Sequence, residues 1–262
     1  MDRFDTSVAH PARRYNYWLG GKDHFAADRE SGDLIIRAFP TARVAALENR
    51  AFLRRSVRFL AESGVRQFLD IGTGLPVPDN THEIAQRVDP SARVLYVDND
   101  PIVMTHSRAL TVGSPTGRTG YVEADLRSPE LILGRPELRT VLDLREPVAL
   151  LLVAVLHFLH DDDQAERIVR ELLAALPPGS YLVASNLTLD HAPPAQVAKH
   201  EELLAAGRTD ARARNHSEFG RFFTGLELVP PGIVAVSDWH PTSDVRPSAA
   251  DVSIYGAVAR IP

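Results

Sequence analysis

The chain has 262 residues, of which 44% are hydrophobic and 24% charged, which is ordinary for a soluble globular protein and allows one large α/β domain or two small ones. The formal net charge of −5 gives no electrostatic reason to expect a nucleic acid partner, and the lack of cysteine excludes disulfides, thiolate metal sites and cysteine nucleophiles. The sequence opens without a signal-peptide pattern, and its longest apolar run, 148–159, is too short to cross a bilayer, so we expect a cytoplasmic protein without a membrane partner.

The first 64 residues are expected to form a helical cap. Pro11 suits a first helical turn, and Gly20-Gly21 suits the end of that helix. A longer helix follows, for which the spacing of Val44, Leu47, Ala51 and Val57 or Phe59 predicts a buried face.

The block "RRYNYWLGGKDHF" within this cap allows two interpretations. It could be a lid over a bound ligand, with Tyr15 or Tyr17 facing the reaction and Gly20-Gly21 as a hinge. It could equally be a helix whose aromatic side chains pack in the core. The residues alone leave both open.

From Arg66 onward short apolar runs alternate with helical patterns. Such alternation predicts parallel strands joined by helices on both faces of one sheet, a Rossmann-like doubly wound α/β fold. Strands are expected at 66–72, 92–100, 119–125, 148–156 and 180–187, and helices at 80–90, 101–112, 128–143 and 161–179.

The end of the chain has a different pattern. A helical insert is expected at about 191–224, followed by two strands, 226–241 and 251–261, with no helix between them. These two strands must pair antiparallel, because a parallel pair needs a longer connection. We therefore expect residues 65–262 to form one domain with a mostly parallel sheet that an antiparallel strand closes.

The glycine loop in "FLDIGTGLPVPDN" lies where open α/β sheets bind their ligands. It lacks the Gly-Lys-Ser/Thr ending of a phosphate loop, and Val77, between two prolines, stands where a dinucleotide site needs its third glycine. Asp70, two residues before Gly72, could meet a cation. S-adenosylmethionine carries an ammonium, a sulfonium and no phosphate, so it suits this loop better than a pyrophosphate does.

Two further acids end the next two strands. Asp98 lies 24 residues after Gly74, where a carboxylate can accept hydrogen bonds from ribose hydroxyls, and Asp125 could accept one from an adenine amino group. Capping of the following helices is the structural alternative for all three acids.

Other polar clusters also allow a functional and a structural interpretation. His157 or His160 could be a general base, or could pack or cap. Asp161-Asp162-Asp163 fit the first turn of a helix better than a metal site, so we expect no metal. The basic run Arg208, Arg212, Arg214 and Arg221 could meet an acidic substrate but is more typical of a solvated helix face.

The stretches "FLDIGTG", "YVDND", "EADLR", "AVLHFLHDDD" and "LPPGSYLVAS" together resemble the class I S-adenosylmethionine-dependent methyltransferases. The block "PARRYNYWLGGKDHFAADRE", with "FLDIGTGLPVPDN" and "LYVDNDP", resembles more closely an actinobacterial S-adenosyl methyltransferase family first catalogued as a domain of unknown function. The resemblance implies seven strands in the order 3-2-1-4-5-7-6, with strand 7 antiparallel, and an N-terminal helical cap.

The resemblance also implies roles for individual residues. Asp70 and the glycine loop would line the methionine end of the cofactor, Asp98 the ribose, and Asp125 the adenine, with the sulfonium after the fourth strand. Together with the N-terminal block and the rest of the glycine loop, the full expected cofactor set is Tyr15, Asn16, Gly20, Gly21, Asp70, Gly72, Thr73, Gly74, Asp98, Asn99, Asp125, Leu126, Ala154 and Val155. His157 or Tyr17 is the expected base.

The predicted activity is transfer of a methyl group from S-adenosylmethionine, which leaves S-adenosylhomocysteine, to an O, N or C atom of a small molecule. "AVLHFL" stands where amino methyltransferases acting on adenine carry Asn/Asp-Pro-Pro-Tyr, which argues against a DNA target. The alternatives are a non-catalytic S-adenosylmethionine-binding regulator and an NAD-dependent oxidoreductase. The acceptor and the oligomeric state are not predicted.

Overall fold

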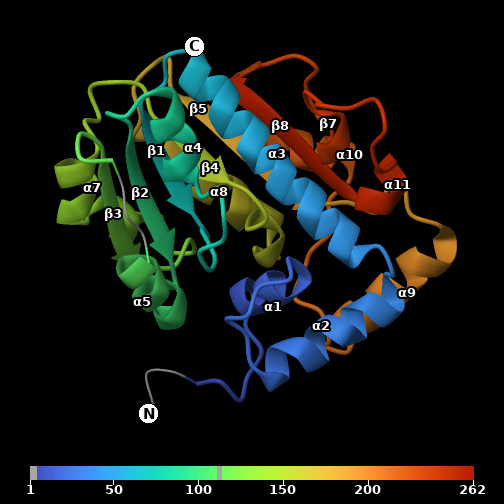
Figure 1. Cartoon of the computed structure of the whole chain (residues 1–262). Coiled ribbons are helices and arrows are strands. Elements are labelled where there is room, and N and C mark those ends of the chain that lie inside the picture. Colours follow the sequence, from blue (N-terminus) through green and yellow to red (C-terminus); the bar gives the residue numbers. More distant parts are fainter. Residues whose placement is uncertain (1–4, 111–113) are drawn as a thin grey trace.

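The computed structural model describes residues 5–110 and 114–262 (Figure 1). The predicted helix at 101–112 is α5, described over Pro101–Leu110, and its last two predicted residues lie outside the described part. Within the described ranges, no helix is both long and apolar enough to cross a membrane.

One mixed sheet organises the molecule. Its strands follow the order β3-β2-β1-β4-β5-β8-β6, and β7 also pairs with β8. The first five strands in the chain are mutually parallel, whereas β8 is antiparallel to β5, β6 and β7. The predicted order and the single antiparallel strand are therefore confirmed. The strands are β1 (Gln67–Ile71), β2 (Arg93–Asp98), β3 (Arg118–Glu123), β4 (Ala149–Leu152), β5 (Tyr181–Leu187), β6 (Glu227–Leu228), β7 (Val234–Ala235) and β8 (Ile254–Arg260).

Two strand predictions were wrong in extent. The strand expected at 226–241 is split into β6 and β7 by Pro230-Pro231 and Gly232, whose φ is +88°. Prolines cannot donate to the ladder of a sheet, so pairing with β8 stops and resumes around them. The strand expected at 148–156 ends with β4 at Leu152, because Ala154 takes a φ of +58° and the short 3-10 helix η1 (Leu156–Phe158) follows.

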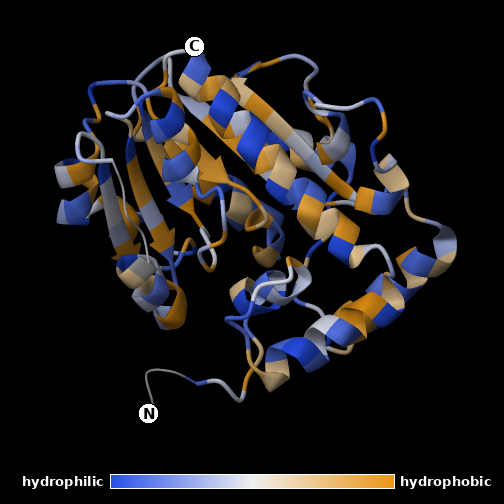
Figure 2. Cartoon of the chain, viewed as in Figure 1, coloured by the Kyte–Doolittle hydropathy of each residue, from blue (hydrophilic) through white to orange (hydrophobic). Residues whose placement is uncertain are grey.

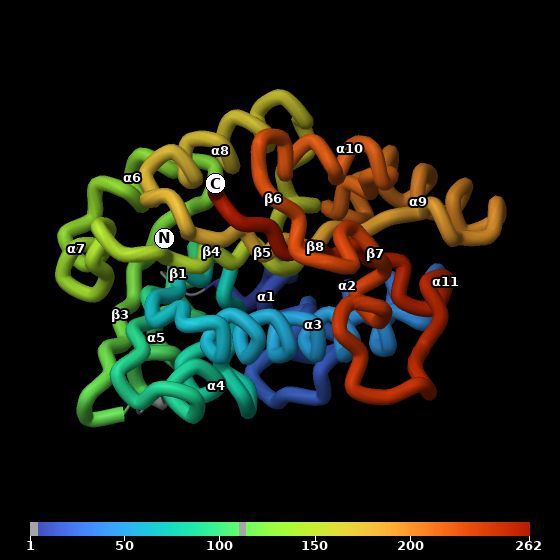
Figure 3. Tube along the Cα trace, turned by 90° about the horizontal axis from the view of Figure 1, so that it is seen from above, coloured from blue at the N-terminus to red at the C-terminus, as the bar shows by residue number. Residues whose placement is uncertain are grey.

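Helices cover both faces of the sheet, as Figure 3 shows from above. One face carries α3 (Ala42–Glu62), α4 (Thr81–Val88) and α5. The other carries α6 (Pro129–Leu133), α7 (Pro136–Val141), α8 (Asp162–Ala174) and α10 (His216–Gly220). The strands are accordingly apolar on both faces, as their colours in Figure 2 show, because both faces are removed from water.

Strand residues alternate between two cores. Phe68 and Leu151 pack beneath α3, whereas Leu69 and Leu150 pack against α8. Helix α3 buries Phe52 and Val57 but leaves Leu47 53% exposed, so the face predicted for this helix was wrong at Leu47.

The N-terminal helices α1 (Pro11–Trp18) and α2 (Ala26–Ala38) lie beyond the sheet edge toward which the arrows of β1 and β2 point (Figure 1). Helix α1 begins at Pro11 and stops before Gly20, whose φ is +79°, as predicted. Helix α9 (Pro194–Ala205) of the insert lies beside α2, and α11 (Ala249–Val252) precedes β8. The boundary at residue 64 stays a prediction, since α3, which lies before it, packs on the sheet.

Candidate active site

A cavity of about 720 Å³ opens at the carboxyl edge of the parallel strands. This volume lies within the range of small-molecule sites, roughly 300–1,000 Å³. Its walls are the ends of five strands, helix α1, one side of α2 and α3, and the insert. The sequence-predicted residues that line it are Tyr15, Asp70, Gly72, Thr73, Gly74, Asp98, Asn99, Asp125, Leu126, Ala154, Val155, His157 and His160.

The glycine loop runs close to the segment that follows β4. Gly72 has a φ of +76°, its N–H donates to the carbonyl of Val97 at 2.8 Å, and a Cβ placed on it would lie 2.7 Å from Cγ2 of Val155. Gly74 has a similar φ of +69° but no neighbour within 4 Å of such a Cβ. The first glycine is thus required by conformation and by contact, the second by conformation alone.

This difference yields a paired prediction. Gly74→Ala is expected to lower the free energy of unfolding by about 1–2 kcal/mol, the cost of a side chain in the left-handed region. Gly72→Ala carries the same cost and adds the clash with Val155, so it is expected to be destabilised further. Urea unfolding of both variants measures the difference. Equal losses of unfolding free energy in the two variants would show that the Val155 side chain moves aside without cost.

Asp70 is a buried carboxyl at the end of β1. Its Oδ2 accepts a hydrogen bond from the Thr81 hydroxyl at 2.6 Å. Burial raises its pKa to about 6, against the opposing effects of the Thr81 hydrogen bond and the Arg50 guanidinium. A cation that enters the cavity would therefore stabilise the ionised form of Asp70.

Asp98, at the end of β2, holds the second glycine of the loop. Its Oδ2 accepts from the N–H of Gly74 and its Oδ1 from the N–H of Asp100, both at 2.9 Å. Burial nevertheless raises its pKa. Each carboxylate oxygen keeps one further acceptor position, so Asp98 can receive two hydroxyl donors from a ligand.

Asp125 accepts hydrogen bonds from both a side chain and the backbone. Its oxygens accept from the Nδ2 of Asn99 at 3.0 Å and from the backbone N–H of Arg127 at 2.8 Å. Burial alone would raise the pKa of Asp125, but these hydrogen bonds and the Arg127 guanidinium hold it below its ordinary value. Leu126 beside it is buried and lines the cavity.

His157 follows β4 on η1, which the insert holds in place. Arg214 donates to the carbonyls of Leu156 and Leu159, and the backbone N–H of Arg212 donates to the His157 carbonyl at 2.7 Å. Burial of the imidazole lowers its pKa to about 4, and its Nδ1 has no hydrogen-bond partner among the described residues. His157 is therefore neutral at neutral pH, with a free ring nitrogen.

The neighbouring polar clusters have structural roles. The Nε2 of His160 lies 2.7 Å from the carbonyl of Asp210, and Asp161 caps α8 by accepting from the N–H of Gln164, as predicted. Arg214 is 1% exposed and also donates to Asp162, so the solvated face predicted for the basic run was wrong at this position.

Only part of the N-terminal block lies at the cavity. Tyr15 lines the cavity, and its hydroxyl donates to the Ala46 carbonyl at 2.8 Å. Tyr17 does not line it, because its hydroxyl donates to Asp33 at 2.7 Å and the Arg43 guanidinium lies over its ring. Three other predicted residues, Asn16, Gly20 and Gly21, are likewise not brought to the cavity.

Several lining residues were not anticipated. Arg50 of α3 donates to the carbonyl of Asp79 at 2.9 Å, while its buried Nε has no hydrogen-bond partner among the described residues. Arg14 of α1 and His200 of α9 also line the cavity. The small residues Ala42, Ala45 and Ala46, with Asn49, mark the cavity face of α3 at the spacing i, i+3, i+4, i+7, and this signal was available in the sequence.

Known proteins are similar to this chain along nearly its whole length. The sequence model described as S-adenosyl methyltransferase matches residues 1–262. A DUF574 family protein from Streptomyces avermitilis is 50% identical, with a TM-score of 0.92, over 98% of this chain and 99% of that chain. A candidate methyltransferase from Thermobifida fusca is 42% identical, with a TM-score of 0.89, over 98% and 96%.

A more distant structure shares the fold. An O-methyltransferase family protein from Burkholderia thailandensis has a TM-score of 0.52 at 14% identity, over 84% of this chain and 57% of that chain. No curated protein sequence matches the chain significantly.

Proposed function

We propose, from the premise that this chain belongs to the S-adenosyl methyltransferase family, that it methylates a small-molecule acceptor in the cavity described above. Family membership makes the chain a methyltransferase that uses S-adenosylmethionine. The proposal for the acceptor rests on one observation: the glycine loop, three strand-end acids and a neutral histidine surround a single cavity of about 720 Å³. A cavity of this kind suits a small molecule.

The residues at the glycine loop fit the charges of the methionine end of the cofactor. Asp70 offers a buried carboxylate to its ammonium, and Arg50 has a buried Nε without a partner among the described residues, which its carboxylate could accept from. Pro76 and Pro78 remove N–H donors that a pyrophosphate would use, and S-adenosylmethionine has no phosphate.

The adenosine end would extend toward β2 and β3. Asp98 would accept hydrogen bonds from the ribose hydroxyls with its two remaining acceptor positions. Asn99 and Leu126 would meet the adenine, with Asp125 holding Asn99 in place. Ala154 and Val155, after β4, would lie nearest the sulfonium.

When bound, S-adenosylmethionine would supply a methyl group activated by its sulfonium: the acceptor atom would form a bond to the methyl carbon as the carbon–sulfur bond breaks and its electron pair stays on sulfur. The residues contribute position and proton acceptance, which such a displacement needs. His157 would take the proton of the acceptor. With a pKa of about 4, His157 would take the proton of a hydroxyl acceptor as the new bond to carbon makes that proton strongly acidic, rather than beforehand.

Substitution of His157 tests this assignment. His157→Phe is expected to lower the turnover rate by about a hundredfold or more, the usual range for a lost general base, without weakening S-adenosylmethionine binding. Tyr17→Phe should keep the wild-type rate, because the Tyr17 hydroxyl is bonded to Asp33 outside the cavity. Steady-state kinetics with the first acceptor identified would compare the two. A larger loss of turnover rate in Tyr17→Phe than in His157→Phe would make Tyr17, not His157, the base.

The proposed function is tested by calorimetric titration with S-adenosylmethionine, S-adenosylhomocysteine and NAD, followed by a methyl-transfer assay against a metabolite panel. Binding of the first two at micromolar concentration, with transfer to a panel member, is the expected result. Binding without transfer to any acceptor would favour a regulator, and binding of NAD alone would favour an oxidoreductase.

A further inference from the structure

The cavity extends beyond the part that the cofactor residues surround. Those residues follow β3, β2, β1 and β4, whereas Leu187 at the end of β5 and Ile254 at the start of β8 also line the cavity. Neighbouring strands are about 4.8 Å apart, so β5 lies about 10 Å from the glycine loop that follows β1. We call this far part, bounded by Ile35, Phe39, Leu187, Leu189, His200, Val252 and Ile254, the β5 chamber.

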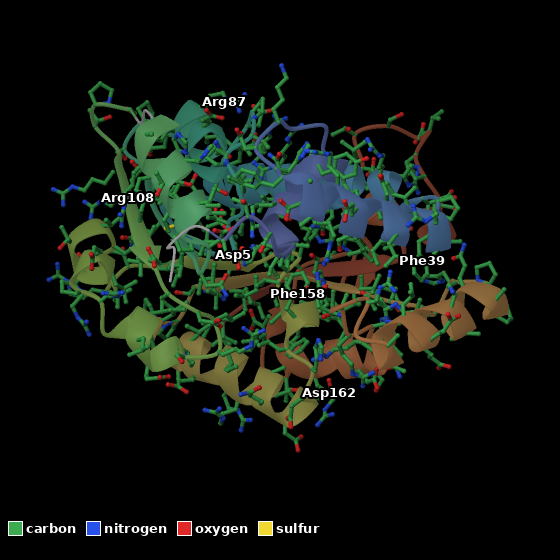
Figure 4. All side chains as sticks on the ribbon, turned by 90° about the horizontal axis from the view of Figure 1, so that it is seen from below. Asp5, Phe39, Arg87, Arg108, Phe158 and Asp162 are labelled. Carbon is green, nitrogen blue, oxygen red and sulfur yellow. The ribbon has the colours of Figure 1, made fainter. Side chains whose placement is uncertain are left out.

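The walls of the β5 chamber are mostly apolar and come from segments distant in the sequence. Helix α2 supplies Ile35 and Phe39, α9 supplies His200, and α11 supplies Val252. Figure 4 views the molecule from the side of α1 and shows Phe158, next to His157, near the middle, with Phe39 farther toward α9. An acceptor in the chamber would therefore reach from His157 toward α9.

The charges near this chamber are already compensated. Arg14 pairs with Asp210 and donates to the hydroxyl of Ser31, and Asp251 accepts from Ser248. Among the described residues that bound the β5 chamber, none is a free cation. A carboxylate or phosphate on the acceptor would thus lose its hydration without gaining a partner.

His200 is the polar exception in the wall. It is 4% exposed, its ring contacts Phe39 edge-on with centroids 6.0 Å apart, and its Nε2 has no hydrogen-bond partner among the described residues. Burial lowers the pKa of His200, against the opposing effect of a hydrogen bond to the backbone of Ala211, so the imidazole is neutral. A neutral imidazole carries one N–H group and one accepting nitrogen, so the His200 ring can still receive one hydrogen bond.

We propose that the β5 chamber is the acceptor subsite and that it takes an uncharged, largely apolar aromatic compound whose hydroxyl or N–H group donates to the accepting ring nitrogen of His200. The aromatic character follows from the rings of Phe39 and Phe158, which line the cavity and contact His200 and His157 edge-on. The inference rests on the proposed function, since it needs the cofactor at the glycine loop. His200 is a specificity-determining residue in this arrangement, and His157 stays nearest the transferred methyl.

The test uses the full chain saturated with S-adenosylhomocysteine and three probes of one shape: 2-naphthol, 2-methylnaphthalene and 2-naphthoate. We expect 2-naphthol to bind about tenfold more tightly than 2-methylnaphthalene, the effect of one hydrogen bond to a buried acceptor, and 2-naphthoate to bind least. In His200→Phe this preference for the hydroxyl should disappear, and in His200→Gln, which keeps an acceptor, it should partly return. His216→Phe, an exposed histidine outside the cavity lining, is the matched control.

The affinity of each variant for S-adenosylhomocysteine is measured first and should equal that of the wild type, which shows that the variant is folded. Tightest binding of 2-naphthoate, or a hydroxyl preference that survives in His200→Phe, would overturn the inference while leaving the proposed function intact. If S-adenosylhomocysteine itself does not bind the wild type, the proposed function fails, and the inference with it.

Discussion

Asp98→Ala is expected to weaken S-adenosylmethionine binding by about a hundredfold or more. Two hydrogen bonds from ribose hydroxyls to a buried carboxylate are lost, and bonds to charged groups contribute about 1.5–3 kcal/mol each, where about 1.4 kcal/mol is tenfold. The loop is affected as well, because the N–H groups of Gly74 and Asp100 lose their acceptor. Calorimetric titration with S-adenosylmethionine measures the change.

Two further variants separate these contributions. Asp98→Asn keeps one acceptor oxygen but loses the charge, so its affinity should fall between those of wild type and Asp98→Ala. Asp163→Ala removes an exposed acid on α8 and should bind as the wild type does. Full affinity in Asp98→Ala would mean that the ribose is held elsewhere and that Asp98 only shapes the loop.

Asp70→Asn is expected to stabilise the cofactor-free protein and to impair its cofactor binding. The pKa of Asp70 is about 6 in the folded chain and near 3.8 when unfolded, so the folded state binds the extra proton between these values. The carboxyl therefore supports folding fully below about pH 3.8, and this support is lost as pH rises through 6, by up to about 3 kcal/mol at 1.36 kcal/mol per pKa unit. The neutral amide of the Asp70→Asn variant would carry no such cost and can still accept from Thr81.

The measurement is urea unfolding of both proteins at a series of pH values. At pH 7.5 the cofactor-free Asp70→Asn variant should be more stable by up to about 3 kcal/mol, and the difference should vanish near pH 4. A constant difference across this range would contradict the assigned pKa. Asp244→Asn, an exposed acid outside the cavity, should leave the pH dependence unchanged.

Cofactor affinity should show the opposite trend. Wild-type binding of S-adenosylmethionine should weaken as the pH falls through about 6, approaching tenfold per pH unit, because protonated Asp70 no longer attracts the ammonium. The Asp70→Asn variant should bind more weakly than wild type at pH 7.5 and should lack this pH dependence. If the affinity of both wild type and Asp70→Asn changed with pH to the same extent, the titrating group would be one other than Asp70.

The sequence predicted the sheet well because the signals are local. An apolar run followed by an acid and a turn marks the end of a parallel strand, and strand ends meet at one edge whatever the loops do. Asp70, Asp98 and Asp125 therefore come together at the cavity, as expected. The early end of β4 was missed because residues 148–156 are apolar throughout, while Ala154 is turned by a contact with Ser185, 31 residues away, whose Oγ accepts its N–H at 2.9 Å.

The sequence by itself thus determined the order of elements and the acidic edge of the sheet, because both depend on neighbouring residues. Only the tertiary structure decided which side chains enter the cavity. Tyr15 and Tyr17 are two residues apart on a short helix and so face different ways, and one lines the cavity while the other pairs with Asp33. His200 lines the cavity and Arg214 holds η1, and both come from an insert whose packing no local pattern specifies. That packing is fixed by buried hydrogen bonds and apolar contacts between segments far apart in the chain.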